Sequence, residues 1–414
     1  MDQAVVLQDA SILDCTGRDL YPHGALVVSD GRIEAVGPVG RVSIPRDAKV
    51  IDVAGKTVMP GLIDAHVHLG FALTSLAQIE AEYPGAVYAF AVARMIEACL
   101  MAGFTTVRDA GGADWSFKHA IERGLIPGPR LLIANSYLSQ TGGHGDWRHR
   151  HDHGAPPCFH PLMATPCICD GVDQVRRGAR EQLRTGADWI KVMAGGGAVS
   201  PTDPLDVPQF TVEELAAAVY EARVVRKKVM AHVYVPEGIK NCVAAGVTSI
   251  EHGNFLDEES AALMRQNGVV LVPTLAAYEV YARYGREQGV SQETLQQIEL
   301  ARGVGSESIR MAMAAGVTIA SGSDVYGQNA GHMAMELELK AQIMGNMASL
   351  MAATQTNAEL LDLAEQIGTL EPGEVADVIV VNGNPVDDIA VLRHPDNISL
   401  VMHRGRLVKG EGIS

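Results

Sequence analysis

The sequence predicts an α/β protein with a (β/α)8 TIM-like barrel and a small β-sandwich built from both chain termini. Two observations predict this fold. Between residues 58 and 368, short apolar segments alternate with helical segments, and eight such units over roughly 300 residues suit a barrel of this kind. Residues 1–57 and 369–414 instead resemble strands joined by turns. Each end alone is too small for an independent β core, so we expect the two ends to pair.

The central strands are expected where runs of branched apolar residues are bounded by glycine, proline or polar residues. These segments are 62–69, 105–109, 131–134, 189–193, 229–233, 249–252, 269–273 and 317–321. Gly103, Gly246 and Gly316 each follow an alanine that ends a helical segment, which is typical of a left-handed helix C-cap. An open doubly wound sheet is the alternative, but no Gly-x-Gly-x-x-Gly follows a strand to favour it.

The terminal strands are shorter and alternate with Gly-containing turns. We expect them at residues 5–7, 25–28, 32–36, 50–53, 376–381 and 400–408. The Pro60-Gly61 turn then marks the point where the β-sandwich leads into the barrel.

Composition and charge exclude several classes of protein. The chain is 47% hydrophobic and 20% charged, which is typical of a compact globular enzyme. Its net charge of −16 argues against a nucleic-acid partner. The first residues show no signal-peptide pattern and no segment resembles a transmembrane span, so we expect a cytoplasmic protein without a membrane partner. The six cysteines are scattered, and Cys167-Ile168-Cys169 beside Cys158 has the wrong spacing for a zinc knuckle.

Metal-capable residues lie at the ends of five predicted strands. His66 and His68 are two residues apart, so on a strand both imidazoles project from the same face. Taken alone, this pair fits a metal site and an accident of alternation equally well. The other strand ends carry Lys191, His232, His252 and Asp324. Because the carboxyl ends of barrel strands share one face, we expect all six side chains to meet there.

Lys191 is an ammonium group inside an apolar strand, where burial of its charge is costly. Reaction with carbon dioxide would turn it into a carbamate, an anionic ligand that can bridge two cations. His66, His68 and Asp324 would then hold one metal, and His232 and His252 the other. Two divalent ions activate a shared water for attack near neutral pH, and Asp324 can carry its proton to a leaving amine.

These residues resemble those of the binuclear metal-dependent amidohydrolase superfamily. Three further stretches are similar to that superfamily: residues 58–64, Glu251-His252-Gly253, and residues 370–377. The resemblance covers nearly the whole chain, and it implies two divalent cations, most often zinc. The mononuclear deaminase branch lacks the bridging lysine and has a His-x-x-Glu motif that His232 does not begin, because Glu237 is at the wrong spacing.

A narrower resemblance is to the prolidase-like group of Xaa-Pro dipeptidases, Xaa-Arg carboxypeptidases and ochratoxin-type amidases. It depends on Gly142-Gly143-His144-Gly145-Asp146 and on His232-Val233-Tyr234. The resemblance implies that His144 and Tyr234 contact the substrate carboxylate and the scissile carbonyl. Taken without it, His144 could be solvent-exposed and Tyr234 could be a packing residue.

The predicted function is therefore hydrolysis of the amide bond in a dipeptide or N-acyl amino acid with a free carboxylate, with Xaa-Pro dipeptides as the preferred substrates. Alternatives are a cyclic-amide hydrolase similar to imidazolonepropionase, an ochratoxin-type amidase, and a dipeptidase for C-terminal Arg or Lys. The last would need an acidic group such as Asp203, Asp206 or Glu279. A non-catalytic relative would lack a ligand, whereas all six are present.

Several residues near the predicted site stay unassigned. Arg148 or Arg150 could clamp a carboxylate. Tyr278, Tyr281 and Tyr284 are spaced by three, as expected for one helix face that either packs or lines a pocket. His332 follows the last predicted strand, and the sequence does not decide its role. The resemblance also implies a homo-oligomer.

Overall fold

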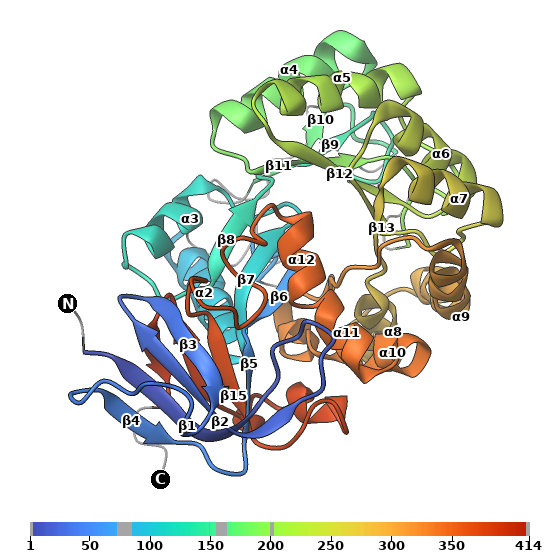
Figure 1. The fold of residues 1–414 in the computed structure, drawn as a ribbon. Helices are drawn as coiled ribbons and strands as arrows, with labels where there is room; N and C mark the ends of the chain where they lie inside the picture. Colours follow the sequence, from blue (N-terminus) through green and yellow to red (C-terminus); the bar gives the residue numbers. More distant parts are fainter. Residues whose placement is uncertain (1–2, 73–84, 149, 155–163, 199–202, 411–414) are drawn as a thin grey trace.

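The computed structural model describes residues 3–72, 85–148, 150–154, 164–198 and 203–410. It is a mixed α/β fold in which a sheet made from both termini lies beside a larger unit of parallel strands and helices (Figure 1). Cys158 lies outside the described residues, whereas Cys167 and Cys169 are free thiols.

The terminal sheet has eight strands, and both ends of the chain contribute to it. The order is β17-β16-β15-β5-β1-β2-β3, with β4 paired to β1. Its strands are β1 (Val5–Ile12), β2 (Tyr21–Ser29), β3 (Arg32–Pro38), β4 (Lys49–Asp52), β5 (Thr57–Pro60), β15 (Val378–Val381), β16 (Ile398–His403) and β17 (Arg406–Lys409). Antiparallel pairing of β15 with β5 joins the two ends of the chain. The predicted association of the termini agrees with this sheet, while the two-layer sandwich and the boundaries at residues 57 and 369 stay predictions.

The second unit contains two parallel sheets. One has the order β6-β7-β8, and the other β10-β9-β11-β12-β13-β14. The strands are β6 (Leu62–Val67), β7 (Phe104–Asp109), β8 (Arg130–Ile133), β9 (Leu138–Ser139), β10 (Cys167–Ile168), β11 (Trp189–Met193), β12 (Lys228–Val233), β13 (Ser249–His252) and β14 (Val270–Val272). Seven predicted central strands therefore coincide with observed ones, and the short β9 and β10 were not predicted.

The eighth predicted strand, residues 317–321, was wrong as a strand. It makes one parallel bridge, Leu271 to Ile319. The physical reason is a side chain: Asn357 accepts from the Ser321 N–H at 3.1 Å and donates to the carbonyls of Ser321 and Ile63 at 2.8 and 2.7 Å. The Asn357 amide thereby occupies the Ser321 N–H and the Ile63 carbonyl, two backbone groups that a continuous ladder would use, although Ser321 O also accepts from the Ala65 N–H.

Backbone hydrogen bonds nevertheless connect the two parallel sheets on both sides. The Asp188 N–H donates to Ile133 O at 2.7 Å, next to β8 and β11. On the other side, the Ala65 N–H donates to Ser321 O at 2.8 Å, and the Ala320 N–H donates to Leu271 O at 2.8 Å. These bonds lie where a closed barrel would join its edges, and closure stays a prediction.

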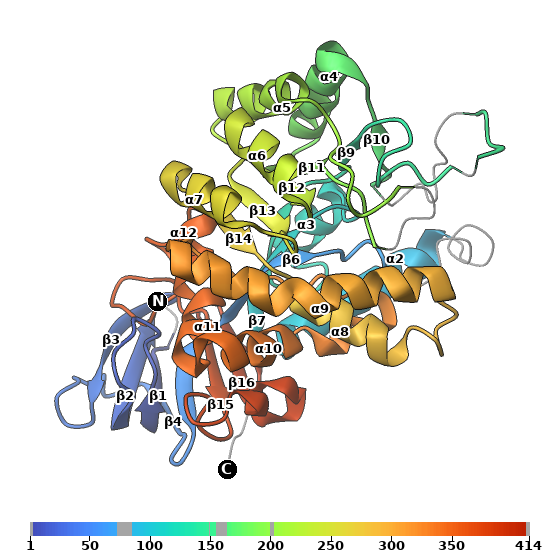
Figure 2. The same ribbon diagram turned by 90° about the vertical axis from the view of Figure 1, so that its right-hand side faces the viewer.

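Helices follow most of the parallel strands and cover their outer side (Figure 2). They are α2 (Gly85–Met101), α3 (Trp115–Glu122), α4 (Gly171–Arg184), α5 (Val212–Val224), α6 (Pro236–Ala245), α7 (Glu258–Asn267), α8 (Leu275–Tyr284), α9 (Gln292–Ala315), α10 (Met335–Met344), α11 (Asn346–Ala352) and α12 (Gln355–Leu360), with 3-10 helices η1 (Gly327–His332), η2 (Ile389–Arg393) and η3 (Pro395–Asn397). Gly246 and Gly316 cap α6 and α9 with φ of 88° and 73°, as predicted.

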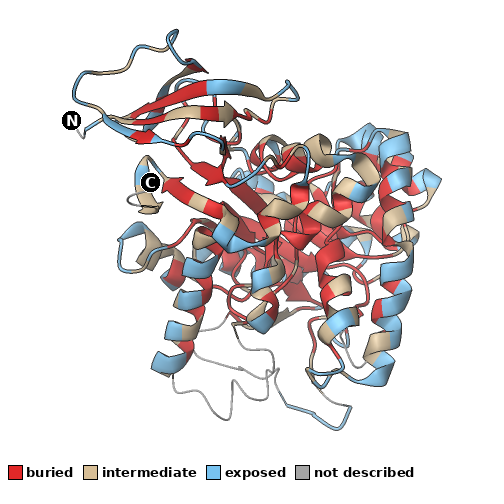
Figure 3. Cartoon of the chain, turned by 90° about the horizontal axis from the view of Figure 1, so that it is seen from below, coloured by how far each residue is buried: buried red, intermediate tan, exposed pale blue. Residues whose placement is uncertain are grey.

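Burial divides this unit into a buried centre and an exposed outer surface (Figure 3). Every residue of β6, β7, β11 and β13 is buried. Such strands are expected to be apolar along their whole length, so a charged side chain in them requires an explanation. Within the described part of the chain, no helix is long and apolar enough to cross a membrane.

Candidate metal centre and substrate site

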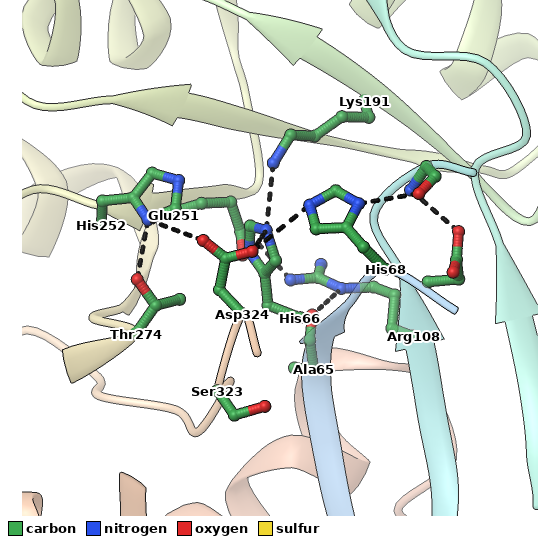
Figure 4. Close-up of polar contacts among 12 residues, drawn as sticks. Ala65, His66, His68, Arg108, Lys191, Glu251, His252, Thr274, Ser323 and Asp324 are labelled. Carbon is green, nitrogen blue, oxygen red and sulfur yellow. Dashed lines mark hydrogen bonds and ion pairs between the residues drawn. The ribbon is translucent and has the colours of Figure 1, made fainter. Parts of the chain in front are cut away.

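The structure brings five of the predicted metal ligands together at the ends of the parallel strands (Figure 4), and the sixth, His232, has its ring centroid 4.5 Å from that of His252. His66 lies on β6, Lys191 on β11, His232 on β12 and His252 on β13, and each is at most 4% exposed. His66, His252 and Asp324 place one ligand atom each within 4.8 Å of one another. Five elements that are distant in sequence therefore converge on one small volume.

Asp324 lies at the centre of this group. Its Oδ1 is 3.4 Å from His68 Nε2 and 3.7 Å from His66 Nε2, and its Oδ2 is 4.0 Å from His252 Nδ1. Lys191 Nζ is 3.4 Å from His66 Nε2. A carboxylate, an amine and three imidazoles thus face one another in a buried volume, an arrangement that is costly without a cation or shared protons.

Each of the four histidines has one ring nitrogen tied to the protein. Nδ1 of His66, His68 and His252 lies 2.6–2.7 Å from Glu251 Oε2, Gly111 O and Thr274 Oγ1, respectively. His232 uses Nε2 instead, at 3.0 Å from Gly196 O. Carbonyl and carboxylate oxygens only accept, so the contacts of His66, His68 and His232 assign the proton to the tied nitrogen, whereas the Thr274 hydroxyl can donate or accept. In these three histidines the other nitrogen keeps its lone pair, as a metal ligand requires, and this donor set fits divalent cations such as zinc.

Burial also sets the charge state of these groups. It lowers the pKa of His66, His232 and His252 well below the usual value, and that of His68 to about 3. Neutral imidazoles are the form that binds metal. Burial likewise lowers the pKa of Lys191 and raises that of Asp324, although each opposes the shift of the other. A lysine with a lowered pKa has a larger share of the nucleophilic neutral amine.

Three residues of the site adopt left-handed backbone conformations that non-glycine residues rarely use. His252, Thr274 and Asp324 have φ of 74°, 51° and 52°. Such conformations cost of order 1–3 kcal/mol each and persist only where the surroundings impose them. Their concentration at one point supports a functional role for this point.

Two buried carboxylates hold the loops that carry the ligands, and sequence reasoning did not single them out. Asp64 accepts from the backbone N–H groups of His66 and Ser323 at 2.9 and 3.1 Å. Asp109 accepts from the N–H groups of Leu69 and Gly111 at 2.7 and 2.9 Å. Burial raises the pKa of Asp64 to about 6 and that of Asp109 to about 7. The signal in the sequence was an acidic residue inside an apolar strand.

His144 and Tyr234 lie against two of the histidines. The His144 ring stacks on His232 with centroids 4.2 Å apart and an angle of 12°. The Tyr234 ring stacks on His252 with centroids 5.2 Å apart and an angle of 15°. His144 Nδ1 is also 3.5 Å from Asp203 Oδ2. Both residues implied as substrate contacts therefore adjoin the metal ligands on the side of His232 and His252.

The three tyrosines of α8 have three different partners. Tyr278 Oη donates to Tyr234 Oη at 3.1 Å. The Tyr281 ring contacts the Tyr326 ring, with centroids 6.2 Å apart, and the Tyr284 ring stacks on His332, with centroids 5.3 Å apart. Burial raises the pKa of Tyr234, so its hydroxyl stays protonated. Tyr278 is thus linked to the candidate site, and Tyr284 and His332 form a separate pair.

The charged candidates in the loops also differ in their surroundings. The Arg148 guanidinium forms a two-pronged contact with Asp146, at 2.7 and 2.6 Å, so its fork is already occupied. Arg150 is exposed. Glu279 is paired with Arg283 and Arg302, and Asp206 is exposed, which leaves Asp203 as the buried acidic group beside His144.

Comparison with known proteins gives consistent matches. Residues 57–408 match the amidohydrolase family. Ochratoxinase from Aspergillus niger is 34% identical over 414 residues, covering 94% of this chain and 84% of that enzyme. A prolidase structure complexed with N-methylphosphonate-L-proline has 40% identity and a TM-score of 0.93, with coverage of 99% of this chain and 100% of that one. A Xaa-Pro dipeptidase structure with methionine bound in its active site has 30% identity and a TM-score of 0.89, with the same coverage.

Proposed function

The chain belongs to the amidohydrolase family, and we propose that it hydrolyses the amide bond of dipeptides or N-acyl amino acids with a free C-terminal carboxylate, preferably Xaa-Pro dipeptides. The observation that carries this proposal is the stacking of His144 and Tyr234 on His232 and His252. It brings an imidazole and a phenol beside a metal-binding centre, as a substrate with a carboxylate next to its scissile amide requires. The similarity to a prolidase and to ochratoxinase supports the same substrate class.

The proposed centre holds two divalent cations, preferably zinc. His66, His68 and Asp324 would hold one, and His232 and His252 the other, with carboxylated Lys191 between them. When bound, the cations supply the Lewis acidity that activates water and polarises the amide carbonyl. Support comes from the unprotonated nitrogens of His66, His68 and His232 and from the buried amine 3.4 Å from His66 Nε2.

The protein side chains divide the remaining work. Asp324 accepts the proton of the attacking water and delivers it to the leaving nitrogen, a role that its central position among the three histidines suits. The Tyr234 hydroxyl donates to the carbonyl oxygen as negative charge develops. His144, next to Asp203, binds the carboxylate of the leaving amino acid. A proline amide has no N–H, so such a site needs no acceptor for one.

Larger-scale features belong to the same proposal. The parallel strands would close into a (β/α)8 barrel over residues 58–368, with the terminal sheet folded as a β-sandwich. Cytoplasmic location, assembly as a homo-oligomer and the lack of a nucleic-acid partner stay predictions.

One observation favours a second substrate preference. Asp203 is buried and its Oδ2 lies 3.5 Å from His144 Nδ1, close to where the leaving residue would bind. An acidic group there would also suit a C-terminal arginine or lysine.

The experiment is a dipeptide screen with zinc-loaded protein at neutral pH. The panel contains Xaa-Pro, Xaa-Arg, N-acyl-Pro and N-acyl-Phe compounds, together with lactams. We expect hydrolysis of Xaa-Pro substrates, loss of at least about 10²-fold for Asp324→Asn, and no cleavage of dipeptide amides that lack the free carboxylate. Hydrolysis of lactams alone, or full activity of Asp324→Asn, would refute the proposal.

A further inference from the structure

Arg108 on β7 is a fully buried cation, and each of its three guanidinium nitrogens donates to a protein group. Its Nε donates to Ala65 O at 2.6 Å, its Nη1 to Ser249 Oγ at 3.2 Å, and its Nη2 to Glu251 Oε1 at 2.9 Å. The guanidinium also lies 4.5 Å from the centre of the Trp189 ring. Arg108 and Glu251 are 0% exposed, so the pair is entirely removed from water. A buried ion pair rarely adds net stability over apolar residues of similar size, so its presence calls for another explanation.

Glu251 connects this pair to the metal centre. Its Oε1 accepts from Arg108 and from the Ser249 hydroxyl, the latter at 2.6 Å. Its Oε2 lies 2.6 Å from His66 Nδ1 (Figure 4). The carboxylate is therefore held by two donors on one oxygen and aims the other oxygen at a histidine.

His66 differs in this respect from the three other histidines. His68 and His232 donate to neutral backbone carbonyls, and His252 pairs with a hydroxyl. A carboxylate is a stronger acceptor than any of these, and it raises the basicity of the opposite ring nitrogen. His66 Nε2 faces both Lys191 Nζ and Asp324 Oδ1, at 3.4 and 3.7 Å.

We propose that Arg108 and Glu251 form a positioning unit that fixes the tautomer and orientation of His66 and thereby sets the affinity of the metal held with His68 and Asp324. The inference depends on the metal centre proposed above, but not on the choice of substrate. The two residues act through His66, and neither touches the reacting atoms. The unit spans β7 and β13 and reaches β6 through the Ala65 carbonyl.

The first test is Glu251→Gln with metal content as the readout. The glutamine side chain has one acceptor oxygen, whereas His66, Arg108 and Ser249 all donate to Glu251. If that oxygen stays with Arg108 and Ser249, the amide NH2 faces His66 Nδ1. The hydrogen bond to His66 is then either lost or reversed, and reversal moves the imidazole proton to Nε2. Protein loaded with zinc is dialysed against a graded series of chelator concentrations and its zinc is counted. We expect one of the two ions to leave at a roughly 10- to 100-fold lower chelator concentration than in the natural protein. Retention equal to the natural protein would overturn the proposal.

The matched control is Glu336→Gln. Glu336 is another buried carboxylate, 1% exposed, whose Oε2 accepts from the Ala276 N–H at 2.8 Å. Its substitution is expected to lower thermal stability while leaving the zinc titration unchanged. Equal loss of zinc in both variants would mean that any buried carboxylate serves, and the proposal would fail.

A double variant separates positioning from stability. Arg108→Met combined with Glu251→Gln removes both charges and leaves no unpaired buried ion, so thermal stability should recover relative to Glu251→Gln. The more weakly bound zinc ion should still be lost at an about tenfold lower chelator concentration than in the natural protein, because a neutral amide replaces the carboxylate. Recovery of both stability and zinc affinity would show that the pair is only structural. A natural protein that binds two zinc ions but cleaves no dipeptide would refute the proposed function and leave this inference standing.

Discussion

Strands β15 and β13 are both four residues long and fully buried, yet they bury different chemistry. β15 reads Val-Ile-Val-Val, and β13 reads Ser-Ile-Glu-His. Burial of the first removes apolar surface from water and stabilises the fold. Burial of the second desolvates polar and charged groups, which costs free energy unless each is paired. The terminal sheet is thus built from residues whose burial stabilises the fold, whereas the ends of the parallel strands retain polar groups whose burial is costly without partners and which belong to the proposed metal centre.

The largest effect that tests this contrast is expected for Lys191→Met. The substitution replaces a buried amine with an apolar side chain of similar length, so the free energy of unfolding should rise or stay unchanged. Activity should fall by at least about 10³-fold, because the proposed bridging ligand is lost and with it several kcal/mol of transition-state stabilisation. Zinc content and kcat/KM are measured together with a thermal melt. A variant that is destabilised but fully active would reverse the contrast.

The opposite result is expected in the terminal sheet for Ile379→Ala. Ile379 is 0% exposed and pairs with Met59 on β5 and Val401 on β16. Loss of its side chain should cost about 2–5 kcal/mol in the free energy of unfolding. We expect unchanged kcat/KM and zinc content below the melting range. Ile379→Val is the graded control, with an expected cost of about 0.5–1.5 kcal/mol. A selective loss of zinc affinity would show that the sheet contributes to the site.

The sequence was sufficient to select the six candidate ligands because their signals are local. His66 and His68 are two residues apart, Lys191, His232 and His252 belong to apolar segments that are themselves strands, and Asp324 follows the apolar segment 317–321. It was insufficient for the residues that hold those ligands. Arg108 and Glu251 are separated by 143 positions, so only the fold reveals that they pair. The prediction of the eighth strand was wrong for a similar reason. The Ser321 N–H donates to the side chain of Asn357, which is 36 residues away in the sequence.

The pH dependence of stability at Asp377 tests the same comparison, because this buried charged group connects the terminal sheet to the unit of parallel strands. Its carboxylate accepts from Arg130 at 3.2 Å and from the Arg404 N–H at 2.7 Å, and it lies 3.1 Å from His403 Nδ1. Burial alone would raise the pKa of Asp377, but these partners hold it below its usual value. A depressed pKa contributes stability above the unfolded value of about 3.9, and that contribution is lost as the pH falls through the lower folded value.

We therefore expect Asp377→Asn to cost about 1–3 kcal/mol in the free energy of unfolding at pH 7. The difference from the natural protein should shrink as the pH is lowered from 5 towards 2, because protonation then removes the same charge. Urea unfolding at a series of pH values measures both. A cost that does not change with pH would show that the carboxylate charge contributes nothing at this join.

The smallest effect is expected for Tyr278→Phe, which tests which tyrosines of α8 contribute to activity and which only pack. Tyr278 is 4% exposed, and its hydroxyl lies 3.1 Å from Tyr234 Oη and 3.3 Å from Asn254 Oδ1, so the phenylalanine keeps the packing and removes the neutral hydrogen bond to Tyr234 together with the contact to Asn254. Such a bond contributes about 0.5–1.5 kcal/mol, which corresponds to a loss of roughly 2- to 10-fold in kcat/KM if it orients Tyr234. Tyr284→Phe, one turn and a half further along α8 and stacked on His332, is the matched control and should leave kcat/KM unchanged. Equal behaviour of the two variants would place Tyr278 with the packing residues and would restrict the functional face of α8 to its contacts with Tyr326.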